Sequence, residues 1–326
     1  MTRRAAWLRD AQWGVFCHYL ADGASVEHAI ELSPDDWNRR IDRFDVEGLA
    51  RQLSSVGARY FFLTVGQNSG YYCSPNQTYD ELVGRNPGRC SRRDLIADLA
   101  AALGAKGIRM MVYVNAGGPG NDALALERLG SYKPHVMDRE AFVAAANRYV
   151  AFQRKWESVV REWSLRWGKG VHGWWVDGCG EPMAGAVYRH DDEPNFKSFA
   201  DALRAGNPES LVAFNNGVRM PVHSSTPHED YTSGELAFAL QVNTPEFFDD
   251  SFKVNGEVNG AQYHVLCYLG QFWGRGAPRF PDELVRGYTR HVIECGGAVT
   301  WDVPVSDEGS IPEAFLRQLA NLHSAG

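Results

Sequence analysis

Short apolar runs alternate with amphipathic segments along almost the whole chain. Such runs, bounded by glycine or polar residues, are typical of strands that are buried on both faces, whereas apolar residues at every third or fourth position indicate helices. The sixth of the runs is the weakest, because it is short and polar. Eight segments are predicted to be strands: 13–19, 58–65, 108–114, 171–176, 211–214, 231–233, 263–269 and 298–303.

The segments between these strands carry helical patterns. We expect the helix that follows Ser91 to be capped by that serine, because Asp94 stands three residues on, at the spacing of a capping box. Because parallel strands need a crossover between them, the alternation predicts an α/β fold, a (β/α)8 TIM-type barrel forming a single domain over residues 1–326. Helices are predicted at 3–12, from 33 onwards, at 46–56, from 91 onwards, and at 138–167, 196–205, 281–294 and 310–323.

Composition narrows the classes of partner. A net charge of -7 with dispersed Lys and Arg argues against nucleic acid, which calls for a basic surface. No segment has the length and apolar character of a signal peptide or a membrane span, so we expect a cytoplasmic protein with no membrane contact. The six cysteines include no Cys-x-x-Cys pair, which favours reduced thiols, and we expect no metal and no cofactor. A homo-oligomer is compatible with this composition.

Polar and aromatic residues follow the predicted strands. Asp177 ends the apolar run that includes Trp175, and glycines follow it, so this carboxylate is expected at the edge of a polar cleft. Active sites of (β/α)8 barrels are built from residues at the carboxyl ends of the strands. Two carboxylates with aromatic rings fit a carbohydrate ligand. The residues at these ends are His18, Tyr19, Gln67, Asn68, Tyr71, Asn115, Asp177, Glu181, Asn215, Asn216, Glu229, Asp230, Glu235, Gln271, Trp273 and Asp302.

Several motifs resemble, in order, those of the family 29 glycoside hydrolases, the retaining α-L-fucosidases. The run from Trp13 to Tyr19 resembles the first-strand Phe-Gly-x-Phe-x-His-Trp-Gly signature of that family. The resemblance extends over about residues 7 to 322, and each motif is weaker than their order. The further segments that resemble the family are 57–64, 93–95, 174–178, 214–217, 230–235, and 296–297 with 304 and 307–309.

The resemblance implies a retaining exo-glycosidase that hydrolyses an α-linked, fucose-like sugar by double displacement. It implies that Asp177 is the nucleophile and that Glu235 is the acid/base, although Glu181 or Glu229 could take the second role. A non-catalytic carbohydrate-binding barrel is the alternative, and Trp175 and Trp273 could equally be core residues. The substrate-binding candidates are His18, Tyr19, Gln67, Asn68, Tyr71, Trp175, Glu181, Asn215 and Trp273.

The chain departs from the family pattern in two places. Where the fucosidases have Lys-His-His-Asp-Gly-Phe, this chain has Gly66 to Tyr71, so Gln67 and Asn68 stand where two sugar-contacting histidines are expected. Their amides can bond hydroxyl groups but do not titrate, and we therefore expect an altered sugar specificity. The family also commonly carries a C-terminal β-sandwich, whereas here the last predicted helix ends the sequence, so we expect the barrel alone.

Overall fold

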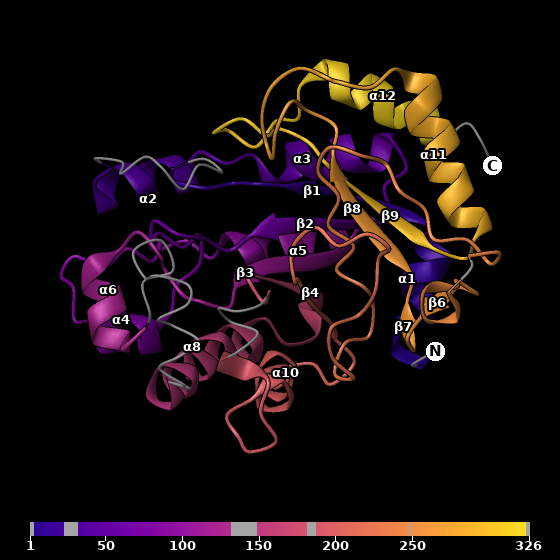
Figure 1. The fold of residues 1–326 in the computed structure, drawn as a ribbon. Coiled ribbons are helices and arrows are strands. Elements are labelled where there is room, and N and C mark those ends of the chain that lie inside the picture. The colour runs from indigo at the N-terminus through magenta and orange to yellow at the C-terminus, as the bar shows by residue number, and fades with distance from the viewer. Residues whose placement is uncertain (1–2, 23–31, 132–148, 181–186, 248, 324–326) are drawn as a thin grey trace.

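The computed structural model describes residues 3–22, 32–131, 149–180, 187–247 and 249–323. Seven parallel strands form one curled sheet in the order β5-β4-β3-β2-β1-β9-β8 (Figure 1). Each strand lies within one of the predicted segments or extends it by a single residue. The strands are β1 (Trp13–Cys17), β2 (Tyr60–Thr64), β3 (Arg109–Asn115), β4 (Val171–Asp177), β5 (Leu211–Phe214), β8 (His264–Tyr268) and β9 (Ala298–Asp302).

An irregular segment, residues 230–236, fills the gap between β5 and β8. Asp230 N donates to Val212 O on one side (2.8 Å), and Leu266 N donates to Gly234 O on the other (2.8 Å). The segment occupies the sixth strand position of a (β/α)8 barrel, so the predicted fold class is confirmed.

The predicted strand at 231–233 is nevertheless wrong as a regular strand. The side-chain hydroxyl of Thr232, and not its backbone, pairs with the backbone of His264 in β8. It accepts from His264 N (2.9 Å) and donates to His264 O (2.7 Å). Gly234 then adopts a φ of +61°, and a Cβ there would lie 2.0 Å from the same carbonyl oxygen. Only glycine fits this bend, which turns the chain immediately before Glu235.

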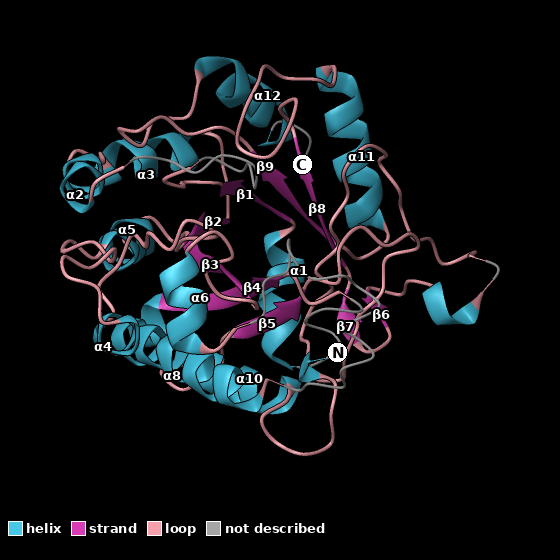
Figure 2. Ribbon diagram, turned by 60° about the vertical axis from the view of Figure 1, so that its left-hand side comes forward, coloured by secondary structure: helices cyan, strands magenta, loops and turns pink. Residues whose placement is uncertain are grey.

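The helices surround the sheet (Figure 2). Helices α4 and α6 were not predicted. Of the predicted helix 138–167, the structure describes α8, which begins at Val150 after Tyr149 in a left-handed conformation; residues 138–148 lie outside the described part. No helix that the structure describes is both long and apolar enough to cross a membrane. The helices are α1 (Ala6–Ala11), α2 (Pro34–Asp42), α3 (Val46–Ser55), α4 (Gln77–Val83), α5 (Leu95–Gly104), α6 (Ala123–Leu129), α8 (Val150–Trp167), α10 (Phe196–Leu203), α11 (Asp282–Glu294) and α12 (Glu313–His323).

Three short 3-10 helices and a small hairpin complete the assignment. They are η1 (Arg3–Ala5), η2 (Gly168–Gly170), η3 (Asp250–Phe252), and the antiparallel pair β6 (Glu257–Val258) and β7 (Ala261–Gln262).

The cap of α5 differs from the prediction. The side chain of Asp94, not that of Ser91, accepts from Ala97 N (3.0 Å). The Ser91 hydroxyl instead donates to Arg93 O (2.6 Å). The backbone bends at Arg92 and Arg93, and the helix begins at Leu95, three positions later than a Ser91 cap requires.

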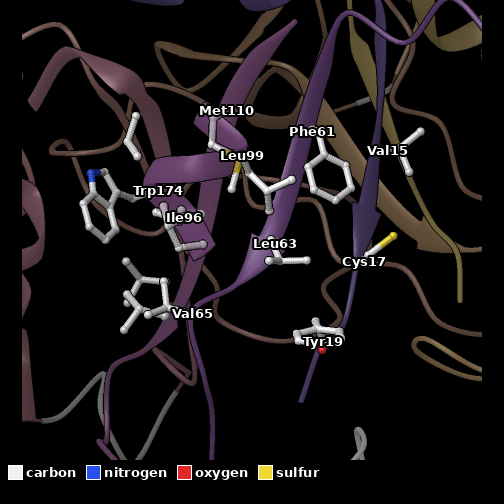
Figure 3. Packing of buried hydrophobic residues seen from close by; sticks show 14 of the residues in the cluster. Val15, Cys17, Tyr19, Phe61, Leu63, Val65, Ile96, Leu99, Met110 and Trp174 are labelled. Carbon is white, nitrogen blue, oxygen red and sulfur yellow. The ribbon is translucent and has the colours of Figure 1, made fainter. Parts of the chain in front are cut away.

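Alternate strand residues build two separate cores. Residues such as Val15, Leu63 and Trp174 point outwards and pack beneath the helices (Figure 3). Residues such as Phe16 and Trp175 point into the barrel, whose lower end is filled by side chains of α1. Because the period of a strand is two, the residue that follows Trp175 on the inner face is at position 177.

Candidate active site

Asp177, the last residue of β4, presents its carboxylate at the carboxyl end of the barrel. Tyr113 Oη donates to Asp177 Oδ2 (2.7 Å), while Asn215 Nδ2 and Gly178 N each donate to Oδ1 (2.8 Å). These donors come from β3, from the end of β5 and from the loop after β4. Three hydrogen bonds from three parts of the barrel therefore fix the direction of this carboxylate.

A single amide joins Asp177 to Glu235. The nitrogen of Asn215 that donates to Asp177 also donates to Glu235 Oε2 (2.6 Å). The two carboxylate oxygens are thus no further apart than these two hydrogen bonds placed end to end. The bend at Gly234 delivers Glu235 to this point, and its neighbour Leu236 is held by Leu266 O (2.8 Å).

The surroundings of Glu235 favour its protonated form. Burial, followed by the negative charge of Asp177, raises the pKa of Glu235 to about 7. The hydrogen bond from Asn215 and the nearby His18 act in the opposite direction and lower this pKa. A carboxyl group with such a pKa still holds its proton close to neutral pH, as a general acid must.

Side chains from several strands line one cavity with the two carboxylates. Two of them, Phe16 and Leu266, are apolar floor residues. The cavity is lined by Phe16, His18, Gln67, Tyr113, Trp175, Asp177, Glu235, Leu266 and Trp273.

His18 is held by a buried carboxylate. Its Nδ1 lies 2.7 Å from Asp302 Oδ2, and Gly274 N donates to Asp302 Oδ1 (2.6 Å). Burial raises the pKa of Asp302, and the adjacent His18 lowers it. Asp302 therefore joins β1, β9 and the loop that carries Trp273. The other ring nitrogen of His18, Nε2, has no hydrogen-bond partner among the described residues and remains for a ligand.

Gln67 reaches the nucleophile candidate through Tyr113. Its Nε2 donates to Tyr113 Oη, which in turn donates to Asp177. Tyr113 is not among the predicted site residues, because it lies inside an apolar run. The signal was its position two residues before Asn115, on the face of β3 that points into the barrel.

Three of the predicted substrate-binding residues lie elsewhere. The hydroxyl of Tyr19 donates to Asp307 O (2.8 Å), and its ring belongs to the outer core (Figure 3). Tyr71 is buried against Trp37 and donates to a backbone carbonyl outside the cavity. Asn68 is absent from the cavity lining. A residue that follows a strand can point to either side of the barrel wall, and Tyr19 and Tyr71 point away from the cavity.

Of the two other candidates for the acid/base, Glu229 binds backbone amides and does not line the cavity. Its carboxylate accepts from Phe214 N (3.1 Å), Ser225 N (2.6 Å) and Thr226 N (2.7 Å). Burial raises the pKa of Glu229 to about 8, and these hydrogen bonds lower it. Glu229 thus secures the loop after β5 rather than the cavity. Glu181 lies outside the described residues.

The remaining polar chemistry of the described chain is simple. All six cysteines are free thiols. Among residues whose positions are described, no group of three His, Cys, Asp or Glu side chains is arranged to hold a metal ion.

A family model described as Alpha-L-fucosidase matches residues 31–251. A search of curated protein sequences found no match. Among solved structures, the chain is similar to an endo-fucoidan hydrolase variant from glycoside hydrolase family 107, with a TM-score of 0.72 and 21% identity. That comparison covers 98% of this chain and 53% of the other, so the chain spans about half the length of that relative.

Two fucosidase structures are also similar. An α-L-fucosidase from Lactobacillus casei, in complex with the product α-L-fucose, has a TM-score of 0.64 and 15% identity over 98% of this chain and 97% of that chain. A family 29 α-L-fucosidase from Bacteroides thetaiotaomicron has a TM-score of 0.64 and 14% identity over 99% of this chain and 73% of that chain. At such identities the similarity establishes the shared barrel fold.

Proposed function

Since the chain belongs to the α-L-fucosidase family, a family of glycoside hydrolases, we propose that it removes a terminal, α-linked, fucose-like sugar with retention of configuration. The observation that carries the proposal is the amide of Asn215, which holds Asp177 and Glu235 together. Carboxyl groups about 5 to 5.5 Å apart suit retention, whereas inversion needs roughly 6.5 to 9.5 Å to admit a water. The shared donor supports the shorter separation.

In the first step, an oxygen of the Asp177 carboxylate attacks the anomeric carbon, and the bond from that carbon to the glycosidic oxygen breaks. Glu235, protonated, gives its proton to the departing oxygen. The product is a covalent glycosyl ester on Asp177 and a free aglycone alcohol. Because its pKa is raised to about 7, Glu235 still holds this proton near neutral pH and can donate it.

In the second step, the roles of Glu235 reverse. Its carboxylate takes a proton from a water, the water oxygen attacks the anomeric carbon, and the ester bond to Asp177 breaks. Gln67 and His18 are placed to bond sugar hydroxyl groups, and Trp273 offers an aromatic surface to the sugar ring. The residues that line the cavity thus offer a candidate for the nucleophile, for the acid/base and for the ring contacts of this mechanism.

Trapping tests the nucleophile directly. Incubation with 2-deoxy-2-fluoro-α-L-fucosyl fluoride, followed by digestion and mass spectrometry, is expected to place the label on Asp177. Asp177→Gly should be inactive alone and should form a β-fucosyl azide when azide is added, because the small anion replaces the missing carboxylate. Label on another residue, or β-L-fucose as the first product of the unmodified protein by NMR, would contradict the mechanism.

A second candidate function is cleavage inside a fucose-containing chain. The observation that favours it is the higher TM-score with the endo-fucoidan hydrolase variant, 0.72, than with the fucosidases, 0.64. Chromatography of products from a fucan oligosaccharide separates the two, since an exo-enzyme releases only monosaccharide. A sugar-binding barrel without catalysis would instead show no turnover of either substrate and unchanged binding in Asp177→Asn.

A further inference from the structure

Phe238 is an exposed apolar side chain close to the proposed acid/base. Its side chain is 88% exposed, more than that of any other large hydrophobic residue whose exposure the structure describes. It follows Glu235 by three residues, in the segment that leaves the carboxyl end of the barrel. Phe272, in the loop after β8, is 39% exposed and precedes the cavity residue Trp273. Both residues therefore belong to the face that carries the active site.

Phe238 is held in its outward position from both sides. Just before it, Ala237 O accepts from Arg279 Nη2 (2.7 Å). Three residues beyond it, Gln241 O accepts from Tyr288 Oη (2.7 Å), and the backbone nitrogen of the buried Asn243 donates to Tyr263 Oη (2.9 Å). The exposure of the ring is thus a property of an anchored segment and not of a free loop.

One side chain, Arg279, connects the backbone beside Phe238 to the aromatic residues at and after the end of β8. The Arg279 guanidinium that binds Ala237 O also lies 3.8 Å from the centroid of the Tyr268 ring. Tyr268 in turn lies 4.8 Å from Trp273 and 5.9 Å from Phe272, between ring centroids. Arg279 and Tyr268 thus link the backbone next to Phe238 to the cavity residue Trp273.

We propose that Phe238, assisted by Phe272, is a platform for the aglycone, and that this aglycone is a carbohydrate chain of two or more sugars. The inference rests on the proposed function, because the acid that protonates the leaving oxygen must face the leaving sugar. The aglycone consequently leaves past Glu235 and over Phe238. Flat rings bind the C–H faces of sugars, and a chain of several sugars offers such faces beyond the first leaving sugar.

Phe238 contributes more to the platform than Phe272. The guanidinium of Arg275 lies over the Phe272 ring at 5.0 Å and so covers one of its faces. No cation–π or ring contact of Phe238 is found among the described residues, so both faces of its ring are open to a ligand.

Two substrates test the platform. We expect Phe238→Ala to lower kcat/KM for a fucose-terminated tetrasaccharide roughly fivefold to tenfold, the loss of one aromatic contact, mainly through KM. The same variant should hydrolyse 4-nitrophenyl α-L-fucoside within about twofold of the unmodified rate, since that aglycone carries no sugar chain to lie on the ring. Phe238→Tyr should restore the tetrasaccharide rate. Leu165→Ala, which removes a 55% exposed apolar side chain on α8, is the matched control and should change neither rate.

The outcomes separate this inference from the proposed function. Aryl fucoside turnover with equal tetrasaccharide rates in Phe238→Ala, Phe272→Ala and the unmodified protein would overturn the platform and leave the glycosidase proposal standing. Absence of turnover of both the aryl fucoside and the tetrasaccharide in the unmodified protein would overturn the glycosidase proposal instead. In that event calorimetry decides the platform: Phe238→Ala must weaken tetrasaccharide binding but not L-fucose binding, and equal loss for both would refute it.

Discussion

The amide of Asn215 offers the sharpest test of the site, because one nitrogen serves both carboxylates. Asn215→Ala removes the hydrogen bonds to Asp177 Oδ1 (2.8 Å) and Glu235 Oε2 (2.6 Å) together. The backbone position is secured separately, since Asn215 N donates to Val176 O and Asn215 O accepts from Cys179 N, each at 2.7 Å. The substitution should therefore alter the chemistry while the barrel stays folded.

The direction of the effect on Glu235 follows from the sign of the lost interaction. The bond from Asn215 lowers the pKa of Glu235, so its removal must raise that pKa further above about 7. A hydrogen bond to a charged group contributes about 1.5 to 3 kcal/mol, and 1.36 kcal/mol corresponds to roughly one pKa unit. Because the nitrogen is shared between two acceptors, we expect the lower end, about one unit.

The assay is kcat/KM for an aryl α-L-fucoside between pH 4 and 10. A general acid must be protonated, so activity falls above its pKa, and the alkaline limb should move from about pH 7 to about pH 8 in Asn215→Ala. At the optimum, loss of orientation should lower kcat/KM about tenfold to a hundredfold. Asn216→Ala, a neighbouring amide with no hydrogen bond to either carboxylate, is the control. An alkaline limb that stays in place or moves to lower pH would refute the assigned role of Glu235.

Three further expectations concern single side chains. Tyr113→Phe removes one donor to Asp177 and should lower kcat about tenfold with little change in Tm, measured by stopped assay and calorimetry; an unchanged kcat would contradict its positioning role. Burial raises the pKa of Glu229 from 4.5 to about 8, so the folded protein binds this proton more tightly than the unfolded chain does. The free energy of unfolding should therefore fall as the pH rises from about 4.5 to about 8. In urea titrations over this pH range, Glu229→Gln should show a smaller fall. Asp122, whose side chain is 2% exposed, forms ion pairs with Arg85 and Arg89. Asp122→Asn should lower the free energy of unfolding by about 2 to 3 kcal/mol. A loss below about 0.5 kcal/mol would show that these ion pairs contribute little to stability.

The regular strands and most of the large helices could be predicted from the sequence. In a parallel sheet covered by helices, the buried strands are continuous apolar runs, whereas the helices have apolar residues only at every third or fourth position. The helices α4 and α6 could not, since each has only seven residues and two or three buried positions, too few to show a helical period. The segment at 231–233 failed for a different reason. Its pairing depends on the hydroxyl of Thr232 and on the bend at Gly234, which no pattern of apolar residues records.

The sequence by itself determined the barrel and the strand ends at which Asp177 and Asn215 stand, because those positions follow from local periodicity and from the family motifs. Only the tertiary structure decided which of the polar residues at those ends share a cavity. Asn215 meets both carboxylates, and Tyr113 supplies the hydroxyl that Gln67 reaches, because residues distant in sequence approach when the sheet curls. Tyr19 has the same kind of sequence position but faces the outer core. The physical difference is the side of the barrel wall to which each side chain points, which the closure and twist of the sheet establish and the local sequence does not.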